Sequence, residues 1–178
     1  WNQGQHFFRR LVEVGDQCGY DSIWFSDRVV SHQLALEPIV AMALVAALSE
    51  KMKFGTAVTQ LPLRNPVVLA KEMASLDYLS GGRFLPAFGL GGDDPREYQA
   101  CGVKKGTRAR RTDEAITVMR RLWTEESVTH EGEFFTLDNV AVTPKPVQKP
   151  CMPMWIGGRS MAAANRAGRL GDGWLVSS

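Results

Sequence analysis

The 178-residue sequence has little of what marks metalloproteins, secreted disulfide proteins, membrane proteins or nucleic-acid-binding proteins. Its three cysteines lie far apart, no CxxC is present, and its three histidines do not cluster with them, so we expect no structural metal site. No apolar run reaches the roughly 20 residues of a membrane helix, and no block of lysine or arginine indicates a nucleic-acid partner. Free thiols fit a reducing compartment, so we expect a cytoplasmic protein without a membrane partner.

What the sequence does contain is the composition of a globular domain, with 44% hydrophobic and 22% charged residues and a formal net charge of +2. The chain opens on Trp1 without a signal-peptide pattern and passes almost at once into a helical pattern, so we expect a first strand upstream. The length suits a single domain.

Helical periodicity and capping residues predict six helices. Their markers are Phe7–Val12 with Gly19 as C-cap, the stripe Leu36, Ile39, Val40, Ala43, Leu44, Ala47 and Leu48, the N-cap pair Asn65-Pro66, the pair Asp94-Pro95 with Glu97 completing a capping box, the stripe Ala115–Trp123, and Ser160 to Gly171.

Five short and almost continuously apolar runs lie between these helices, at Ser22–Ser26, Phe54–Leu61, Phe84–Leu90, Met154–Ile156 and Trp174–Val176. Such runs are typical of parallel strands buried on both faces, and their alternation with helices predicts an α/β fold. A β-hairpin, Val128–Leu137 within an insertion of about residues 127–139, precedes the proline-rich connector Pro144–Pro153.

Five parallel strands fit two architectures. One is an open doubly wound sheet, for which the length is ample. The other is part of a (β/α)₈ barrel, which typically needs about 250 residues. Length favours the open sheet, and the motifs favour the barrel.

In both architectures the functional loops follow the carboxyl ends of the strands. After the first strand, Asp27 could bind a ligand or form a surface ion pair with Arg28. The small residues of the second strand, before Thr59, let a bulky group approach the backbone or simply pack. The cluster Gly89–Gly92 is neither GxGxxG nor a P-loop, and it either exposes backbone N–H groups or forms a plain turn.

The fourth strand is followed by Gly157-Gly158-Arg159-Ser160 at the start of a helix. Exposed amides, a helix N-terminus, a hydroxyl and a guanidinium predict a phosphate site, the alternative being a tight turn with a serine cap. No nucleophile or metal-hydrolase motif is present, so the chemistry is expected to come from a bound cofactor.

Five blocks carry a resemblance to a known family: Thr56–Pro66, Leu76–Phe84, Pro144–Gln148, Trp155–Ser160 and Gly171–Trp174. In this order they resemble the bacterial luciferase-like monooxygenase superfamily, and most of all its branch of coenzyme F420-dependent oxidoreductases. The resemblance implies a (β/α)₈ TIM barrel of which residues 1–178 form one incomplete domain with strands two to six. It also implies a parent chain of about 250–300 residues and a homodimer when full-length.

The resemblance also assigns roles to residues. Asp27 would contact the polar edge of the cofactor and is the one catalytic candidate, and Arg28 stands where the family has a histidine. A non-proline cis peptide at Ala57–Val58, before Thr59, would lie against the ring. The cofactor's ribityl chain and phosphate would contact Gly89, Leu90, Gly91 and Gly92, although Leu90 replaces an arginine of some flavin-using members and Gly92 a glutamate of some deazaflavin-using members. The turn Gly157, Gly158, Arg159 and Ser160 would bind the phosphate.

The function implied is hydride transfer between coenzyme F420 and a small organic substrate. One alternative is an FMN-dependent monooxygenase that activates oxygen, and another is a non-catalytic relative or inactive barrel fragment. A doubly wound nucleotide-binding domain is a further alternative.

Overall fold

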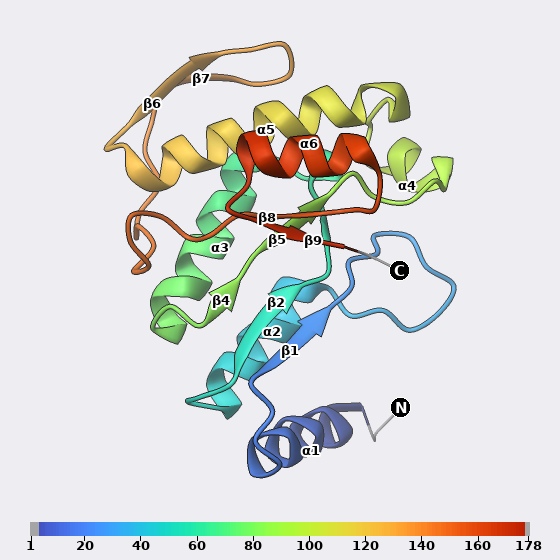
Figure 1. Cartoon of the computed structure of the whole chain (residues 1–178), viewed down its shortest axis with the longest axis vertical. Helices are drawn as coiled ribbons and strands as arrows, with labels where there is room; N and C mark the ends of the chain where they lie inside the picture. The colour runs from blue at the N-terminus through green and yellow to red at the C-terminus, as the bar shows by residue number, and fades with distance from the viewer. Residues whose placement is uncertain (1–3, 177–178) are drawn as a thin grey trace.

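The computed structural model describes residues 4–176, in which parallel strands form two adjoining sheets (Figure 1). The first sheet contains β1 (Ser22–Phe25), β2 (Lys53–Thr56) and β4 (Phe84–Leu85), and the second contains β3 (Thr59–Gln60), β5 (Ala87–Gly89), β8 (Trp155–Gly157) and β9 (Gly173–Leu175). The helices are α1 (Gly4–Gln17), α2 (Pro38–Leu48), α3 (Pro66–Ser80), α4 (Pro95–Ala100), α5 (Arg108–Thr124) and α6 (Met161–Leu170), with 3₁₀ turns at Leu61–Leu63 and Lys105–Thr107.

The strands lie side by side in the order in which the chain makes them. Segment β2/β3 pairs with β1 on one side and with β4/β5 on the other, and β8 and β9 follow, always in parallel. A doubly wound sheet reverses its strand order at a switch point, whereas a barrel wall does not. The predicted barrel wall is therefore confirmed, and the open doubly wound alternative is wrong.

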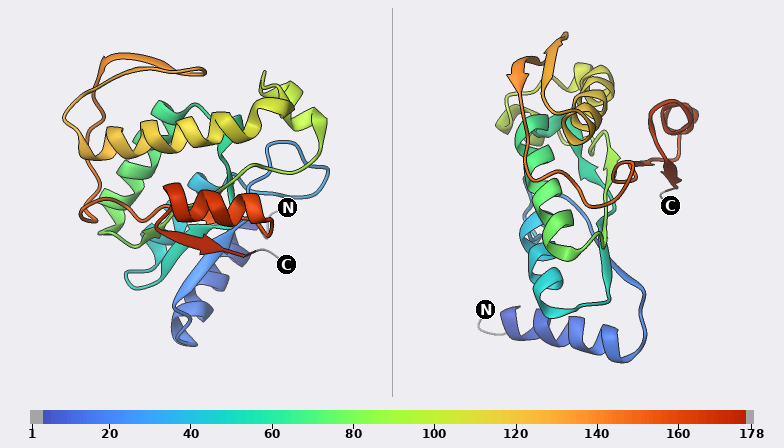
Figure 2. Two further views of the ribbon diagram at one scale, coloured as in Figure 1. Left: turned by 45° about the horizontal axis from the view of Figure 1, so that its top comes forward. Right: turned by 90° about the vertical axis from the view of Figure 1, so that its left-hand side faces the viewer.

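The helices follow the same order on the outside of this wall. Apart from the short α4, each helix contacts the next along the chain, from α1 to α2, α2 to α3, α3 to α5 and α5 to α6. In the right-hand view of Figure 2, α2, α3 and α5 (cyan to yellow) lie together on one side of β1 to β5. Right-handed crossovers between neighbouring parallel strands place every helix on the same face, which is the arrangement a barrel requires.

Two of the predicted strands are each interrupted once. The expected strand Phe54–Leu61 divides into β2 and β3 at the cis peptide Ala57–Val58, so the expectation of a cis bond at this position is confirmed. The expected strand Phe84–Leu90 divides into β4 and β5 at Pro86, which has no N–H to donate to a ladder. Each division transfers the chain from the first sheet to the second.

The predicted amphipathic stripe of α2 is correct only in part, because Ile39, Leu44 and Leu48 pack half-buried against the core while Leu36 is exposed. The residues that this helix buries are Pro38, Ala41, Met42 and Val45, whereas Val40 of the expected stripe is 69% exposed. The α2 sequence contains no polar residue, and a helix that is apolar all round has no periodicity to show which face turns inward. The contacts with α3 and β2 decide the orientation instead.

The predicted hairpin is present, and the structure shows how it is attached to α5. Strands β6 (Val128–Glu131) and β7 (Thr136–Val140) pair antiparallel, and β6 contacts α5. The Glu114 carboxylate of α5 accepts hydrogen bonds from the backbone N–H groups of Phe134 and Phe135, which fastens the turn to the helix. Within residues 4–176, no helix combines the length and apolarity needed to cross a membrane.

The N-cap of α3 gives a direct test of the helix assignments. The Asn65 side-chain oxygen accepts hydrogen bonds from the N–H groups of Val67 (2.9 Å) and Val68 (3.3 Å), as its sequence context predicts. We expect Asn65→Ala to lower the free energy of unfolding by about 0.5–2 kcal/mol, because both donors lose their partner. Urea unfolding measures this, with Asn65→Asp as the control that keeps the acceptor. Equal stability of Asn65→Ala and the unchanged protein would contradict the assignment.

Candidate active site

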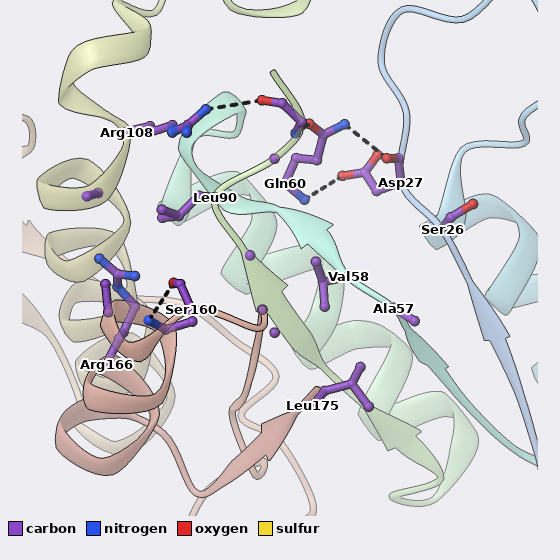
Figure 3. Close-up of a pocket in the computed structure, with 18 of the residues that line it drawn as sticks. Ser26, Asp27, Ala57, Val58, Gln60, Leu90, Arg108, Ser160, Arg166 and Leu175 are labelled. Atoms are coloured by element: carbon purple, nitrogen blue, oxygen red, sulfur yellow. Dashed lines mark hydrogen bonds between the residues drawn. The ribbon is translucent and has the colours of Figure 1, made fainter. Parts of the chain in front are cut away.

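A cleft of about 660 Å³ opens where the carboxyl ends of the strands meet (Figure 3). It is lined by ten of the residues predicted to form the site: Asp27, Ala57, Val58, Gly89, Leu90, Gly91, Gly92, Gly157, Gly158 and Ser160. The chain brings them together from four separate loops, as parallel strands of a barrel wall do.

Two predicted residues do not line this cleft. Thr59 is buried, and its hydroxyl donates to the Thr56 hydroxyl (3.0 Å), which in turn donates to the carbonyl of Ala87 (2.8 Å). Arg159 is exposed and lies outside the lining set. Thr59 thus connects neighbouring strands, and the guanidinium groups of the cleft come from other residues.

The floor of the cleft is the Ala57–Val58 segment, which packs against two glycines. A Cβ atom on Gly89 would lie 2.4 Å from Val58 Cγ2, and one on Gly157 would lie 2.3 Å from Val58 Cγ1. Only glycine fits at these two positions while Val58 keeps this place. The floor is therefore apolar and presents backbone on either side of Val58.

Asp27 is buried and both of its carboxylate oxygens are already bonded. Oδ2 accepts from the backbone N–H of Gln60 (2.9 Å), and Oδ1 accepts from Nη2 of Arg64 (2.7 Å). Burial lowers the pKa of Arg64, but Asp27 and Glu37 outweigh it and raise the pKa above its ordinary value. The geometry shows Asp27 holding its loop against β3 and the following turn, and a direct role toward a cofactor stays a prediction.

Glu97 does not complete the predicted capping box. Asp94 caps α4 as expected, through the N–H of Arg96 (2.9 Å), and hydrogen bonds from the Arg96 side chain lower the pKa of Asp94 to about 2. The fully buried Glu97 carboxylate instead accepts from the N–H groups of Val29 (3.1 Å) and Val30 (3.2 Å). Because α4 packs on the loop after β1, these donors take the carboxylate away from the cap.

Gln60 joins the loops that Asp27 and Glu97 hold. Its Nε2 donates to the Asp27 carbonyl (2.9 Å) and to Glu97 Oε1 (3.1 Å), and its Oε1 accepts from the N–H of Gly92 (3.2 Å). Gln60 is absent from the residues predicted to form the site, although its place at the end of the second predicted strand was the available signal. Gln60 fixes the β1 and β5 loops relative to each other at the mouth of the cleft.

The cationic end of the cleft comes from two arginines that the sequence analysis missed. Arg166 of α6 is 8% exposed, and its Nε donates to Asp113. Arg108 of α5 donates from Nη1 to the Gly92 carbonyl (3.2 Å) and to Asp93 (3.1 Å). Arg166 shares the buried face of α6 with alanines, so helical periodicity from Ser160 onward was the signal that could have found it.

The N-terminus of α6 lies at the same end. Ser160 caps the helix by accepting from the N–H of Ala163 (3.2 Å), and Ala162 and Ala163 line the cleft. Figure 3 shows Ser160, Arg166 and Arg108 on one side of the strand that leads to Leu90. A helix N-terminus beside two guanidinium groups favours a phosphate or another dianion.

The cleft supplies few groups for acid–base chemistry. Among the described residues that line it, Asp27 is the only carboxylate, and histidine, lysine, cysteine and tyrosine do not occur. An apolar floor, backbone at its sides and a cationic end fit a planar cofactor that carries a phosphate. The donor set therefore agrees with the class of cofactor that the sequence predicted.

Comparisons with known proteins agree with this geometry. The family model of the luciferase-like monooxygenases matches residues 2–178. An F420-dependent glucose-6-phosphate dehydrogenase of Kineococcus radiotolerans is 34% identical over 92% of this chain and 50% of its own length. An FMNH₂-dependent dimethylsulfone monooxygenase of Pseudomonas putida is 27% identical over 95% of this chain and 48% of its own length.

The solved structures show the same fold. The crystal structure of the monooxygenase RslO1 from Streptomyces bottropensis superposes with a TM-score of 0.87 and 29% identity, over 96% of this chain and 53% of that one. The chain thus spans about half the length of the relatives described here. With its family model matched over nearly every residue and its barrel wall superposing on a solved member, the chain belongs to the luciferase-like monooxygenase family.

Proposed function

We propose that the protein is an oxidoreductase that transfers a hydride between coenzyme F420 and a small organic substrate. The observation that carries a planar, phosphate-bearing redox cofactor is the composition of the cleft, in which an apolar floor at Val58 leads to a cationic end at Arg166 and Arg108. The dehydrogenase relative of Kineococcus radiotolerans, named as F420-dependent, supports this choice of cofactor.

Different residues of this chain would bind the ring and the phosphate of the cofactor. Val58 and the backbone of Gly89 and Gly157 provide the surface against which a flat ring can pack. Arg166, together with Ser160 and the N-terminal amides of α6, provides the donors for a phosphate. When bound, the deazaflavin supplies the hydride chemistry, and the protein contributes binding, orientation and electrostatics.

The second candidate is an FMN-dependent monooxygenase. The Pseudomonas putida relative is named as FMNH₂-dependent, and the RslO1 structure is that of a monooxygenase. FMN also joins a flat ring to a phosphate, so the floor and the cationic end of the cleft suit it equally. The absence of a histidine, lysine or tyrosine among the described lining residues is compatible with either cofactor.

A fluorescence titration of the purified protein with F420 and with FMN separates the two. We expect F420 to bind at least tenfold more tightly than FMN, which corresponds to about 1.4 kcal/mol. Tighter FMN binding together with NADH-supported oxygen uptake would replace the first proposal with the second. Failure of both to bind would contradict both and favour a non-catalytic relative.

A further inference from the structure

Arg28 lines the cleft but has no role in the proposed binding of the cofactor. It follows Asp27 in the loop after β1 and lines the cleft, and its side chain is 51% exposed. Its Nη1 lies 3.6 Å from Oε2 of the fully buried Glu97. This oxygen has no hydrogen-bond partner within the described residues. The Arg28 guanidinium therefore balances the negative charge of the buried Glu97 carboxylate.

The position of Arg28 depends on glycine at residue 92. A Cβ atom on Gly92 would lie 2.8 Å from Nη1 of Arg28. Any side chain at residue 92 would therefore displace the guanidinium from its place over Glu97. The arginine and the glycine form one arrangement, in which Arg28 occupies the space that a side chain at residue 92 would need.

The other two arginines of the cleft are held differently. Arg108 is bonded to the Gly92 carbonyl and to Asp93, and Arg166 is bonded to Asp113. In Figure 3 both lie with Ser160 on the α5 and α6 side of the strand leading to Leu90. Asp27, which precedes Arg28, lies across that strand, on the β1 side. Arg28 and Arg108 both lie beside Gly92, whereas Ser160 and Arg166 belong to α6 and its N-cap. A phosphate held by Ser160 and Arg166 therefore leaves Arg28 available for a second ligand.

We infer that Arg28 binds an anionic group of the substrate, a carboxylate or a phosphate, beside the cofactor ring. A guanidinium has five N–H donors arranged to match two oxygens of such a group. Glu97 contacts this guanidinium through Nη1 alone, and half of the Arg28 side chain is exposed to solvent. The carboxylates near Arg28 are Glu97 and Asp94, whose pKa the charge of Arg28 helps to lower, and both lie outside the set of residues that line the cleft.

That the anion belongs to the substrate rests on the proposed function, whereas the binding of an anion by Arg28 does not. The test uses matched probes on the protein with and without its cofactor: butyrate against butyramide, and butyl phosphate against butanol, followed by ligand-observed NMR. We expect each anion to be preferred at least tenfold over its neutral partner, because hydrogen bonds to a charged group are the stronger kind. The larger of the two preferences identifies whether carboxylate or phosphate is the natural group.

With the cofactor bound, so that its phosphate occupies the site at Ser160 and Arg166, Arg28→Gln is expected to abolish this preference. The affinity for F420 and FMN is expected to stay within twofold of that of the unchanged protein. Arg28→Gln/Glu97→Gln removes the buried charge as well and guards against a folding defect, which thermal unfolding detects. Arg96→Gln, an exposed arginine of α4 outside the lining set, is the matched control and should keep the preference.

Two results would overturn the inference: equal binding of anionic and neutral probes to the unchanged protein, or a loss of cofactor affinity in Arg28→Gln as large as the loss of anion affinity. The latter would make Arg28 part of the cofactor site. If neither cofactor binds but the anion preference persists and depends on Arg28, the proposed function fails while the anion site stands.

Discussion

Replacing Arg64 with methionine is expected to lower the free energy of unfolding by about 3 kcal/mol, because it leaves a buried carboxylate without its cation. The Asp27 side chain is fully buried and its Oδ1 lies 2.7 Å from Nη2 of Arg64, whose own side chain is 22% exposed. Removing one partner of such a pair costs far more than the intact pair contributes. Chemical unfolding in urea, with the midpoint and slope both fitted, measures the loss.

A double variant shows whether the loss comes from the uncompensated charge. In Arg64→Met/Asp27→Asn the carboxylate is gone, while an amide oxygen can still accept from the Gln60 N–H. We expect this protein to recover more than half of the lost stability. Lys53→Met, which removes the exposed ion pair with Asp21, should change stability by less than about 1 kcal/mol. No recovery in the double variant would mean that the lost packing of Arg64 dominates.

The sequence predicted the fold well where one principle decided each element. Continuous apolar runs predicted strands buried on both faces, which holds for the strand residues of the run Phe54–Leu61, whereas all four residues of β1 are only half-buried. Glycine or asparagine caps marked where helices began and ended. The order of the strands was not encoded locally. It follows from which runs pair, so the barrel wall was separated from the doubly wound sheet only by the resemblance and then by the observed pairing.

The parts of the candidate site that are formed by backbone could be predicted from the sequence. The parts formed by long side chains that extend into the cleft could not. The glycines within residues 89–92 and 157–158 line the cleft. They could be predicted because the lack of a side chain, and the backbone it exposes, is visible in the sequence. Arg166 and Arg108 reach the cleft from two helices, and their directions depend on how α5 and α6 pack. Arg159 adjoins the glycines and is therefore predicted by the motif, but adjacency along the chain does not set the direction of a side chain.

Arg166 therefore gives the strongest test of the cofactor site. We expect Arg166→Met to weaken the binding of F420, and of FMN where it binds, by roughly tenfold to a hundredfold. The physical reason is the loss of hydrogen bonds from a guanidinium to a dianion in a site where Arg166 is only 8% exposed. Fluorescence quenching at fixed ionic strength measures the dissociation constants.

The chain offers a matched control for this experiment in Arg169. Both arginines bond the Asp113 carboxylate, Arg169 through Nη2 at 2.5 Å, but the Arg169 side chain is 64% exposed and does not line the cleft. A variant that merely disturbs the link between α5 and α6 would affect both positions alike. We therefore expect Arg169→Met and Arg159→Met to keep cofactor affinity within about twofold. Equal losses in Arg166→Met and Arg169→Met would assign Arg166 to helix packing and remove it from the phosphate site.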